Sequence, residues 1–146
     1  MGSLKPSDWL LLLLAEASDP LDRVRIQKSL FLFSKRSKAP AEEKYIFQPY
    51  LYGPFSSTIY RDLDRLAEEG KVRVELHEGA ASPFYRLSPT GRKAATELQE
   101  QVPQARLELL RAVRTWVSTK PFSVLLRTIY QMYPEFAAES IFRDKP

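Results

Sequence analysis

The side chains best suited to specific recognition in this sequence are Ser57, Thr58, Arg61 and Arg65. An arginine can donate two parallel hydrogen bonds to the O6 and N7 atoms of guanine, and serine or threonine can bond to bases or phosphates. Their spacing brings all four onto one side of a helix, if Ser56–Arg65 is helical. Such a helix could lie in the major groove of a duplex and read base edges with its first turns.

A short capped helix is predicted to carry these side chains. Ser56 suits the N-cap position, because a serine oxygen can accept from the free amides of the first turn. Phe55 and Tyr60 have the spacing of a hydrophobic staple, and Gly70 can end the helix in a left-handed conformation. The face turned to the core is expected to be one apolar stripe, formed by Ile59, Leu63 and Leu66.

Two strands and a further helix are predicted next. In Val72–Leu76, apolar residues alternate with charged ones, the pattern of a half-buried strand. The turn His77–Ser82 separates it from a second strand, Phe84–Leu87, and Ser88 followed by proline opens another helix. Helix, strand, turn, strand and helix, in this order, are the elements of a winged helix-turn-helix.

Several stretches carry a resemblance to known families. TIYRDLDRLAEEGKV and FYRLSPTGRKAATEL resemble the recognition helix and wing of PadR-type and MarR-type regulators. RIQKSLFLF, FQPYLYGPFSSTIYRDLDRL and LLRTIYQMYPEFAAESIF together resemble the YwgA-like, phage-associated proteins and, more distantly, Panacea-type antitoxin domains, over about residues 9–142. The resemblance implies a winged-helix fold. It also implies that the protein could neutralise a toxin or act as a protein adaptor. The resemblance identifies no catalytic residue in this sequence.

Composition excludes several kinds of chemistry. The 146 residues are enough for a packed core, and the chain contains no cysteine, which excludes disulfides, zinc–thiolate sites and thiol catalysis. The lack of cysteine fits a reducing cytoplasm, where we expect the protein. Its net charge of +4 and pI near 9.4 permit an anionic partner, provided that the basic residues gather on one face.

An apolar run near the N-terminus resembles a signal peptide. Trp9–Ala15 follows Lys5 and is followed by an A-x-A sequence. The run is far shorter than the ~18 residues that a membrane span requires, and Asp8 lies just before it. We therefore expect a buried first helix, about Ser7 to Ala17, and no association with a membrane.

The next predicted helix, within residues 21–36, is apolar on two sides and should pass through the middle of the domain. Arg25, Lys28, Lys35 and Arg36 occupy what remains of its surface and could face phosphates. They could equally be solvated flanks whose aliphatic stems cover apolar neighbours.

The aromatic segment Tyr45–Tyr52 is predicted to be an edge strand that pairs with the wing hairpin, because Pro49 cannot donate to a central ladder. Its aromatic side chains could stack on bases, but packing against the core and between helices is the favoured interpretation.

The C-terminal third is predicted to be helical, with helices over Pro89–Val102, Gln104–Val117 and Phe122–Met132 and a short one from Pro134 to Ile141. We divide the chain into a winged-helix domain, residues 1–102, and a helical extension, residues 103–146. The extension packs on its own domain or pairs with a second copy. We expect a homodimer through Gln104–Ile141, because this stretch holds more apolar surface than one small domain needs to cover.

Nothing in the sequence predicts an enzyme. His77 is the only histidine, so no relay or metal site can be built around a second one. The acidic pairs Glu42–Glu43 and Glu68–Glu69 are adjacent in sequence and point in different directions. No glycine-rich loop is present to hold a phosphate. We expect no catalytic residues, no metal and no cofactor.

The predicted fold class is α+β and mostly α, with a winged helix-turn-helix, a small antiparallel sheet and a C-terminal helical extension. The predicted core contains Leu13, Leu30, Phe33, Leu63, Leu66, Tyr85 and Leu87. Two functions are carried forward. The favoured hypothesis is a transcriptional regulator that binds double-stranded DNA with Ser56–Arg65 as recognition helix. The alternative is a protein-interaction module, an antitoxin or adaptor, because carboxylates outnumber arginines in Ser57–Glu69 and the wing tip has no basic residue.

Overall fold

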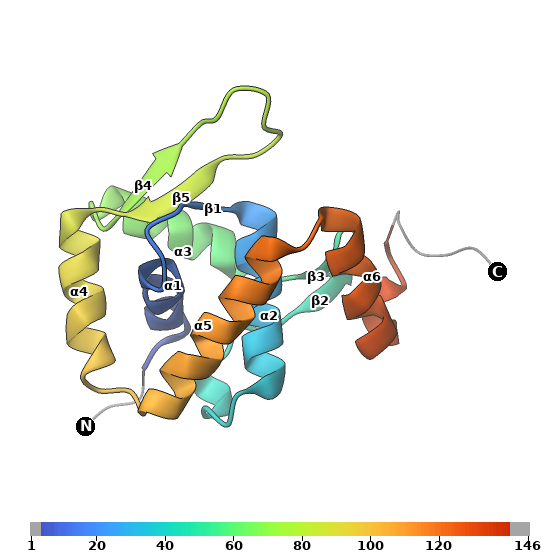
Figure 1. Cartoon of the computed structure of the whole chain (residues 1–146), viewed down its shortest axis with the longest axis horizontal. Helices are drawn as coiled ribbons and strands as arrows, with labels where there is room; N and C mark the ends of the chain where they lie inside the picture. Colours follow the sequence, from blue (N-terminus) through green and yellow to red (C-terminus); the bar gives the residue numbers. More distant parts are fainter. Residues whose placement is uncertain (1–3, 141–146) are drawn as a thin grey trace.

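The structure is a computed structural model that describes residues 4–140, and its fold is α+β and mostly helical (Figure 1). The α-helices of this part are α1 (Pro6–Ala15), α2 (Arg23–Arg36), α3 (Ser57–Glu68), α4 (Pro89–Gln99), α5 (Gln104–Thr119) and α6 (Phe122–Met132). Two 3₁₀ helices are η1 (Ala41–Glu43) and η2 (Pro134–Ala137). The strands are β1 (Leu21–Asp22), β2 (Gln48–Tyr50), β3 (Gly53–Phe55), β4 (Val72–Glu75) and β5 (Phe84–Leu87).

The main sheet is antiparallel, with strand order β1-β5-β4. Tyr85 of β5 lies between Leu21 of β1 and Val74 of β4. The prediction that Tyr45–Tyr52 joins the wing hairpin was wrong, since its strand β2 pairs only with β3 in a separate hairpin. A hairpin closed by a short turn costs less chain entropy than a distant pairing, and β1 is too short for a periodic pattern to reveal it.

Helix α2 forms the centre of the molecule. All of its residues from Ile26 to Phe33 are buried, including the polar residues Gln27, Lys28 and Ser29, so α2 is buried beyond the two apolar sides that its sequence predicted. One hydrophobic cluster joins α2 to α1, α3 and the sheet, and a second joins it to α5, α6 and η2. The predicted core is confirmed, because each of these side chains is buried: Leu13, Leu30, Phe33, Leu63, Leu66, Tyr85 and Leu87.

Helices α5 and α6 share these clusters with the N-terminal part of the chain. Leu110 and Val117 of α5 are fully buried. The buried guanidinium of Arg114 donates from Nη1 to the Leu13 carbonyl oxygen at 2.7 Å and from Nη2 to that of Asp19. Arg114 therefore ties α5 to the end of α1. The part of the predicted Pro134–Ile141 helix that falls on Ile141 lies outside the described residues.

Helix α1 is buried on several sides, as its sequence predicted. Each residue from Trp9 to Leu14 is buried, and Trp9 Nε1 donates to Glu43 Oε1 at 3.1 Å. Within residues 4–140, none of the helices combines the length and the apolar character that crossing a bilayer requires.

Candidate functional site

The start of α3 is held by its neighbour α2. Ser56 occupies the N-cap position, but its hydroxyl makes no capping hydrogen bond, so the predicted role of its side chain was wrong. Instead, the amide of Gln27 donates to the Ser56 carbonyl oxygen at 2.8 Å and accepts from the Ser56 backbone N–H at 2.9 Å. The predicted staple is confirmed, because the rings of Phe55 and Tyr60 meet edge to face with centroids 5.2 Å apart.

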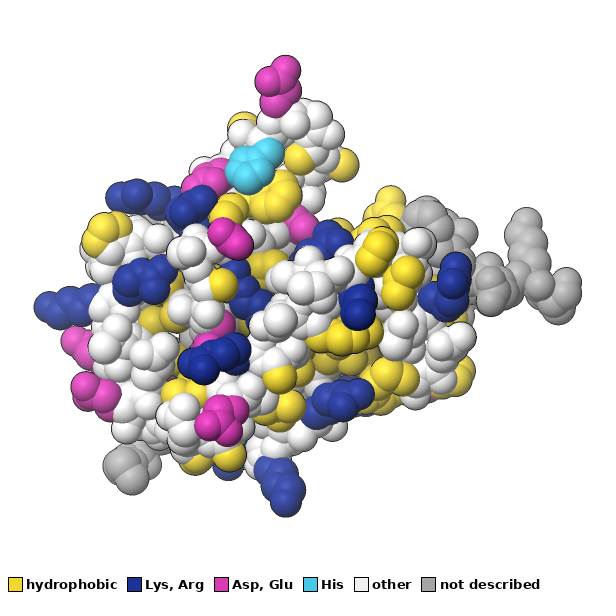
Figure 2. All heavy atoms as spheres, in the orientation of Figure 1, with side chains coloured by type: hydrophobic (Ala, Val, Ile, Leu, Met, Phe, Trp, Pro, Cys, Tyr) yellow, Lys and Arg dark blue, Asp and Glu magenta, His cyan; other side chains and the backbone are white. Residues whose placement is uncertain are grey.

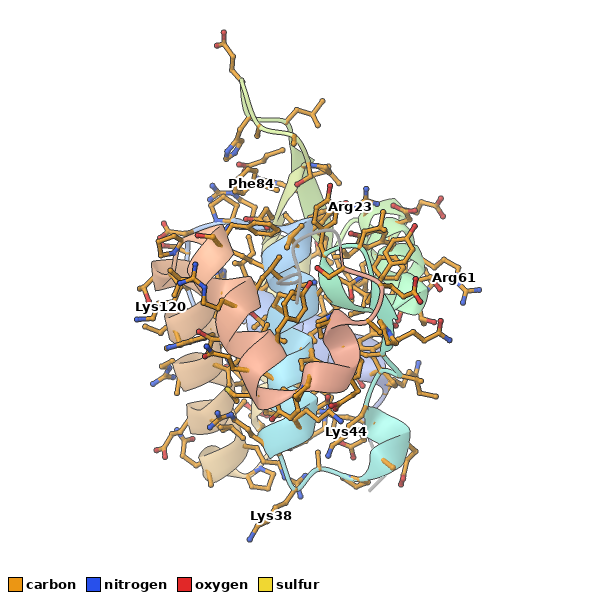
Figure 3. The ribbon with its side chains drawn as sticks, turned by 90° about the vertical axis from the view of Figure 1, so that its right-hand side faces the viewer. Arg23, Lys38, Lys44, Arg61, Phe84 and Lys120 are labelled. Atoms are coloured by element: carbon orange, nitrogen blue, oxygen red, sulfur yellow. The ribbon has the colours of Figure 1, made fainter. Side chains whose placement is uncertain are left out.

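The outer face of α3 is only partly available to a partner. Ser57, Thr58 and Arg61 are exposed, and Arg61 projects to the edge of the molecule (Figure 3). Arg61 Nη2 donates to Thr58 Oγ1 at 3.3 Å. Arg65, in contrast, forms ion pairs with Asp62 and with a glutamate one turn further on, at 3.4 Å and 3.1 Å. In the second half of this face, the positive charge of Arg65 is therefore neutralised by carboxylates of the same helix region.

Asp62 is fixed in this arrangement from the other side. The hydroxyl of buried Tyr45 donates to Asp62 Oδ2 at 2.6 Å. Burial first, and then this hydrogen bond, raise the Tyr45 pKa, so the phenol stays protonated as a donor. Asp62 thus remains beside Arg65 as a counter-charge.

The basic residues predicted on α2 do not join Arg61 on one surface. Arg25 bonds Asp22 at 3.1 Å and donates to the carbonyl oxygens of Val117 and Lys120 at 3.3 and 2.9 Å, so it joins α2 to the end of α5. Lys35 is exposed, but its ammonium lies 5.6 Å from the ring centroids of residues 133 and 136, which follow α6.

Lys28 is the clearest correction to the predicted phosphate contacts. Its side chain is only 2% exposed, and Nζ donates to the Pro54 carbonyl oxygen at 3.0 Å. Burial lowers the Lys28 pKa to about 7, and nearby Asp22 offsets only part of this shift. A buried amine of this kind cannot reach the backbone of a duplex.

The β4–β5 hairpin, predicted as the wing, projects beyond the body of the molecule (Figure 1). Val72 at its base is buried, but Val74 is 48% exposed and Leu76 is 86% exposed, so the predicted half-buried pattern holds only at the base. His77 stacks on Phe84 with ring centroids 4.1 Å apart. His77 also approaches Glu75 at 3.0 Å, and Glu75 forms an ion pair with Arg86.

The β2–β3 hairpin presents consecutive apolar side chains to solvent. Tyr50, Leu51 and Tyr52 are 48%, 40% and 42% exposed. The favoured interpretation, packing of the segment's aromatic residues, is confirmed for Tyr45 and Phe47 but was wrong for the exposed parts of Tyr50 and Tyr52. We call Tyr50, Leu51 and Tyr52 the hairpin patch. A glycine after two apolar residues in an edge strand was the sequence signal for a tight turn that could expose them.

The hairpin rests on α6. Gly53 has a φ of +88°, and a Cβ at this position would lie 3.3 Å from Tyr130 and 3.4 Å from Leu126. Ring contacts continue on both sides, between Tyr50 and Phe55 at 4.8 Å and between Tyr52 and Phe122 at 6.0 Å. The hairpin patch is therefore supported from beneath by a C-terminal helix.

A pocket of about 240 Å³ lies next to the hairpin patch. Its lining residues come from α2, the hairpin and α3: Val24, Gln27, Lys28, Tyr50, Tyr52, Gly53, Phe55 and Tyr60. We call it the tyrosine pocket. Gln27 uses both ends of its amide on Ser56, whereas the ammonium of Lys28 donates to the Pro54 carbonyl oxygen at 3.0 Å.

A second apolar depression, of about 340 Å³, separates α5 from α6 and has α2 beneath it. Among its lining residues, Leu109 and Trp116 are partly exposed and Met132 is 39% exposed. Figure 2 shows hydrophobic atoms gathered between the two helices, with basic side chains around them. We call this depression the α5–α6 groove.

Among the described residues, no three His, Cys, Asp or Glu side chains come together as a metal site would require. Comparison with known proteins gives no family to this chain, because no family model matches it and no curated protein matches its sequence.

Proposed function

We propose that this chain is a protein-interaction module, of the antitoxin or adaptor kind, built on a winged-helix scaffold. The observation that carries the proposal is the hairpin patch, in which three consecutive apolar side chains are exposed beside a helix whose arginine Arg65 is neutralised. Contiguous exposed apolar residues that border a pocket are typical of protein-binding surfaces.

The winged-helix scaffold is supported by element order. The order α1-β1-α2-α3-β4-β5, with η1 and the β2–β3 hairpin inserted between α2 and α3 and with β1 beside β5, supports a helix-turn-helix whose sheet ends in a wing. In this comparison α3 corresponds to the recognition helix and the β4–β5 hairpin to the wing. Fold alone does not decide function, so the surface chemistry must.

Charge supports a protein partner over a duplex. Of the seven side chains predicted to contact DNA, Lys28 is buried, Arg25 bonds to the end of α5, and Arg65 has two carboxylate partners. Nucleic-acid surfaces gather unpaired cations on one face, so that each releases a counterion on binding. The described α3 face offers Arg61 with two hydroxyls and little further positive charge.

Site-directed photo-crosslinking in the cells that make the protein tests the proposal. We expect a benzoylphenylalanine at position 51, in the hairpin patch, to give a discrete cross-linked protein product. The same probe at position 93, an exposed lysine site on α4, is the matched control and should give none. Replacing Tyr50 and Tyr52 by Ser in the position-51 variant should remove the product. Equal products at positions 51 and 93, or no product at either, would overturn the proposal.

DNA binding remains a second candidate function, since one observation favours it. Ser57, Thr58 and Arg61 are exposed together on the first half of α3, the part that enters the groove in helix-turn-helix proteins. In this candidate Arg61 contacts a guanine, and Lys35 gives at most a phosphate contact.

We also propose that two copies associate through the α5–α6 groove. Most apolar residues of α5 are used inside the chain, so the basis for association is smaller than the sequence predicted. It rests on the partly exposed side chains of Leu109, Trp116 and Met132.

A further inference from the structure

We propose that the tyrosine pocket receives an acidic side chain from a partner protein, with an aromatic residue next to it, and that Lys28 is the group that binds the carboxylate. This inference rests on the proposed function and adds to it the chemistry of the segment that is recognised. It concerns a pocket, whereas the proposed function concerns the exposed hairpin patch.

The position of Lys28 is the first argument. Its ammonium has three donor directions, and within residues 4–140 its only hydrogen bond goes to the Pro54 carbonyl oxygen. No carboxylate of the described residues forms an ion pair with it. Buried charges in proteins are normally paired. A carboxylate supplied by a partner would complete this site.

The walls of the pocket are the second argument. Tyr50, Tyr52, Phe55 and Tyr60 line the pocket together with Lys28. Aromatic rings can cover the aliphatic stem of an inserted glutamate, and they offer edges and faces to an aromatic residue beside it. A pocket of about 240 Å³ suits one side chain and is too small for a whole helix.

The support of the pocket is the third argument. Gln27 holds the Ser56 backbone, and Gly53 packs against α6. The α3 side and the hairpin side of the pocket are therefore already ordered before a ligand binds. A preformed pocket loses less conformational freedom on binding than one that must be ordered. The anchor residues of an interface usually fill such preformed pockets.

The test uses two capped tripeptides that differ only in charge, acetyl-Phe-Glu-Phe-amide and acetyl-Phe-Gln-Phe-amide. Each is titrated into the full-length ¹⁵N-labelled protein at pH 6, where Lys28, whose pKa is about 7, is mostly protonated. We expect saturable shifts of the backbone amides of residues 24–28 and 50–60, with at least about fivefold tighter binding of the glutamate peptide. In Lys28→Met the two peptides should bind equally.

A change of pH gives a second readout on the unmodified protein. The charged and titratable groups near Lys28 and its pocket are Asp22, the N-cap residue of α2, the phenols of Tyr50, Tyr52 and Tyr60, and Arg23, whose guanidinium lies 4.0 Å from the Tyr60 ring centroid. Burial raises the pKa of Tyr60, so this phenol stays neutral. The preference for the glutamate peptide should shrink between pH 6 and pH 8.5 as Lys28 loses its proton. This readout decides the case if Lys28→Met fails to fold.

Three results would overturn the inference: equal binding of the two peptides to the wild-type protein at pH 6, shifts confined to another surface, or an unchanged glutamate preference in Lys28→Met. These outcomes are separate from those of the cross-linking experiment. A discrete cross-link at position 51 without a glutamate preference would reject the pocket assignment alone. A glutamate preference without a cross-link would reject the interaction module and leave the pocket as a peptide-binding site.

Discussion

Gln27, in the middle of α2, bonds both backbone groups of Ser56, the residue at which α3 begins. This pair joins α2 to α3 through one buried amide, since Gln27 is 1% exposed and Ser56 is 4% exposed. The Ser56 hydroxyl makes no capping hydrogen bond, so this pair holds the start of α3 through the backbone of Ser56. The angle between α2 and α3 therefore depends on a residue 29 positions earlier in the chain.

Replacing Gln27 by Leu should destabilise the protein by about 1–3 kcal/mol, because the buried Ser56 N–H would lose its partner and the Ser56 carbonyl oxygen would keep only its bond from the Ile59 N–H at 3.2 Å. The free energy of unfolding from urea titration measures the effect. Gln104→Leu, at an exposed glutamine on α5, is the matched control and should change stability by less than about 0.5 kcal/mol. If Gln27→Leu also loses less than about 0.5 kcal/mol, water would be supplying the hydrogen bonds that the Gln27 amide makes to Ser56.

Leu63→Ala should cost about 2–5 kcal/mol, because Leu63 is fully buried and its removal leaves a cavity under α3. The same truncation at Leu51, which is 40% exposed in the hairpin patch, should cost far less. Urea unfolding of the two variants side by side gives the comparison. Equal losses would show that the apolar stripe of α3 does not face a tightly packed core.

The stability of the protein should rise with pH above neutrality because of Lys28. Burial lowers its pKa from 10.5 to about 7 in the folded state. Between these values the unfolded chain holds a proton that the folded chain has released, so the free energy of unfolding increases with pH, by at most about 1.4 kcal/mol per pH unit.

The control for this pH dependence is Lys28→Met, in which the rise should be absent. Urea unfolding at pH 7 and pH 9 for both proteins isolates the Lys28 contribution as a difference of differences. If the wild-type protein and Lys28→Met gain the same stability between these pH values, the amine is not desolvated in solution.

Duplex DNA should not bind measurably at ~50 mM salt, where non-specific electrostatic binding is normally visible. Titration with duplexes from the gene's own promoter and with random duplexes measures this. Saturable binding with a salt slope near 0.9 per phosphate contacted would favour the DNA candidate. In that case Arg61→Ala should cost about 1–3 kcal/mol at one base pair, and Lys35→Ala should weaken all duplexes alike.

Light scattering at micromolar concentration should give a dimer mass for the full chain. Trp116→Glu would put a charge into the α5–α6 groove and should give a monomer, while Lys93→Glu on α4 should leave the mass unchanged. A monomer mass for the wild-type protein would reject the proposed association.

Strong local patterns predicted the helices well. The staple of Phe55 and Tyr60, the core stripe of α3 and the cap at Ser88, which accepts from the Gly91 N–H at 3.0 Å, agree with the structure. These features depend on residues within a few positions of one another, so a single sequence contains the whole signal.

The site was predicted less well, because its decisive contacts join distant parts of the chain. Lys28 and Lys35 lie on the same helix, yet one is buried under the hairpin and the other lies beside rings that follow α6. Periodicity places a residue on a helix face but cannot say which later segment covers it. The neutralised Arg65 was within reach of sequence reasoning, since its carboxylate partners lie three and four residues away.

The packing of Gly53 on Leu126 and Tyr130 also has a consequence for how the chain is made. The β2–β3 hairpin leaves the ribosomal tunnel before α6 has been synthesised. The nascent hairpin is therefore exposed without the surface that later supports it. During that interval the aromatic residues around Gly53 are exposed and can aggregate with other chains. We therefore expect incomplete chains to depend on chaperones more than the full-length protein does. The β2–β3 hairpin can therefore reach its final packing only after α6 has been synthesised.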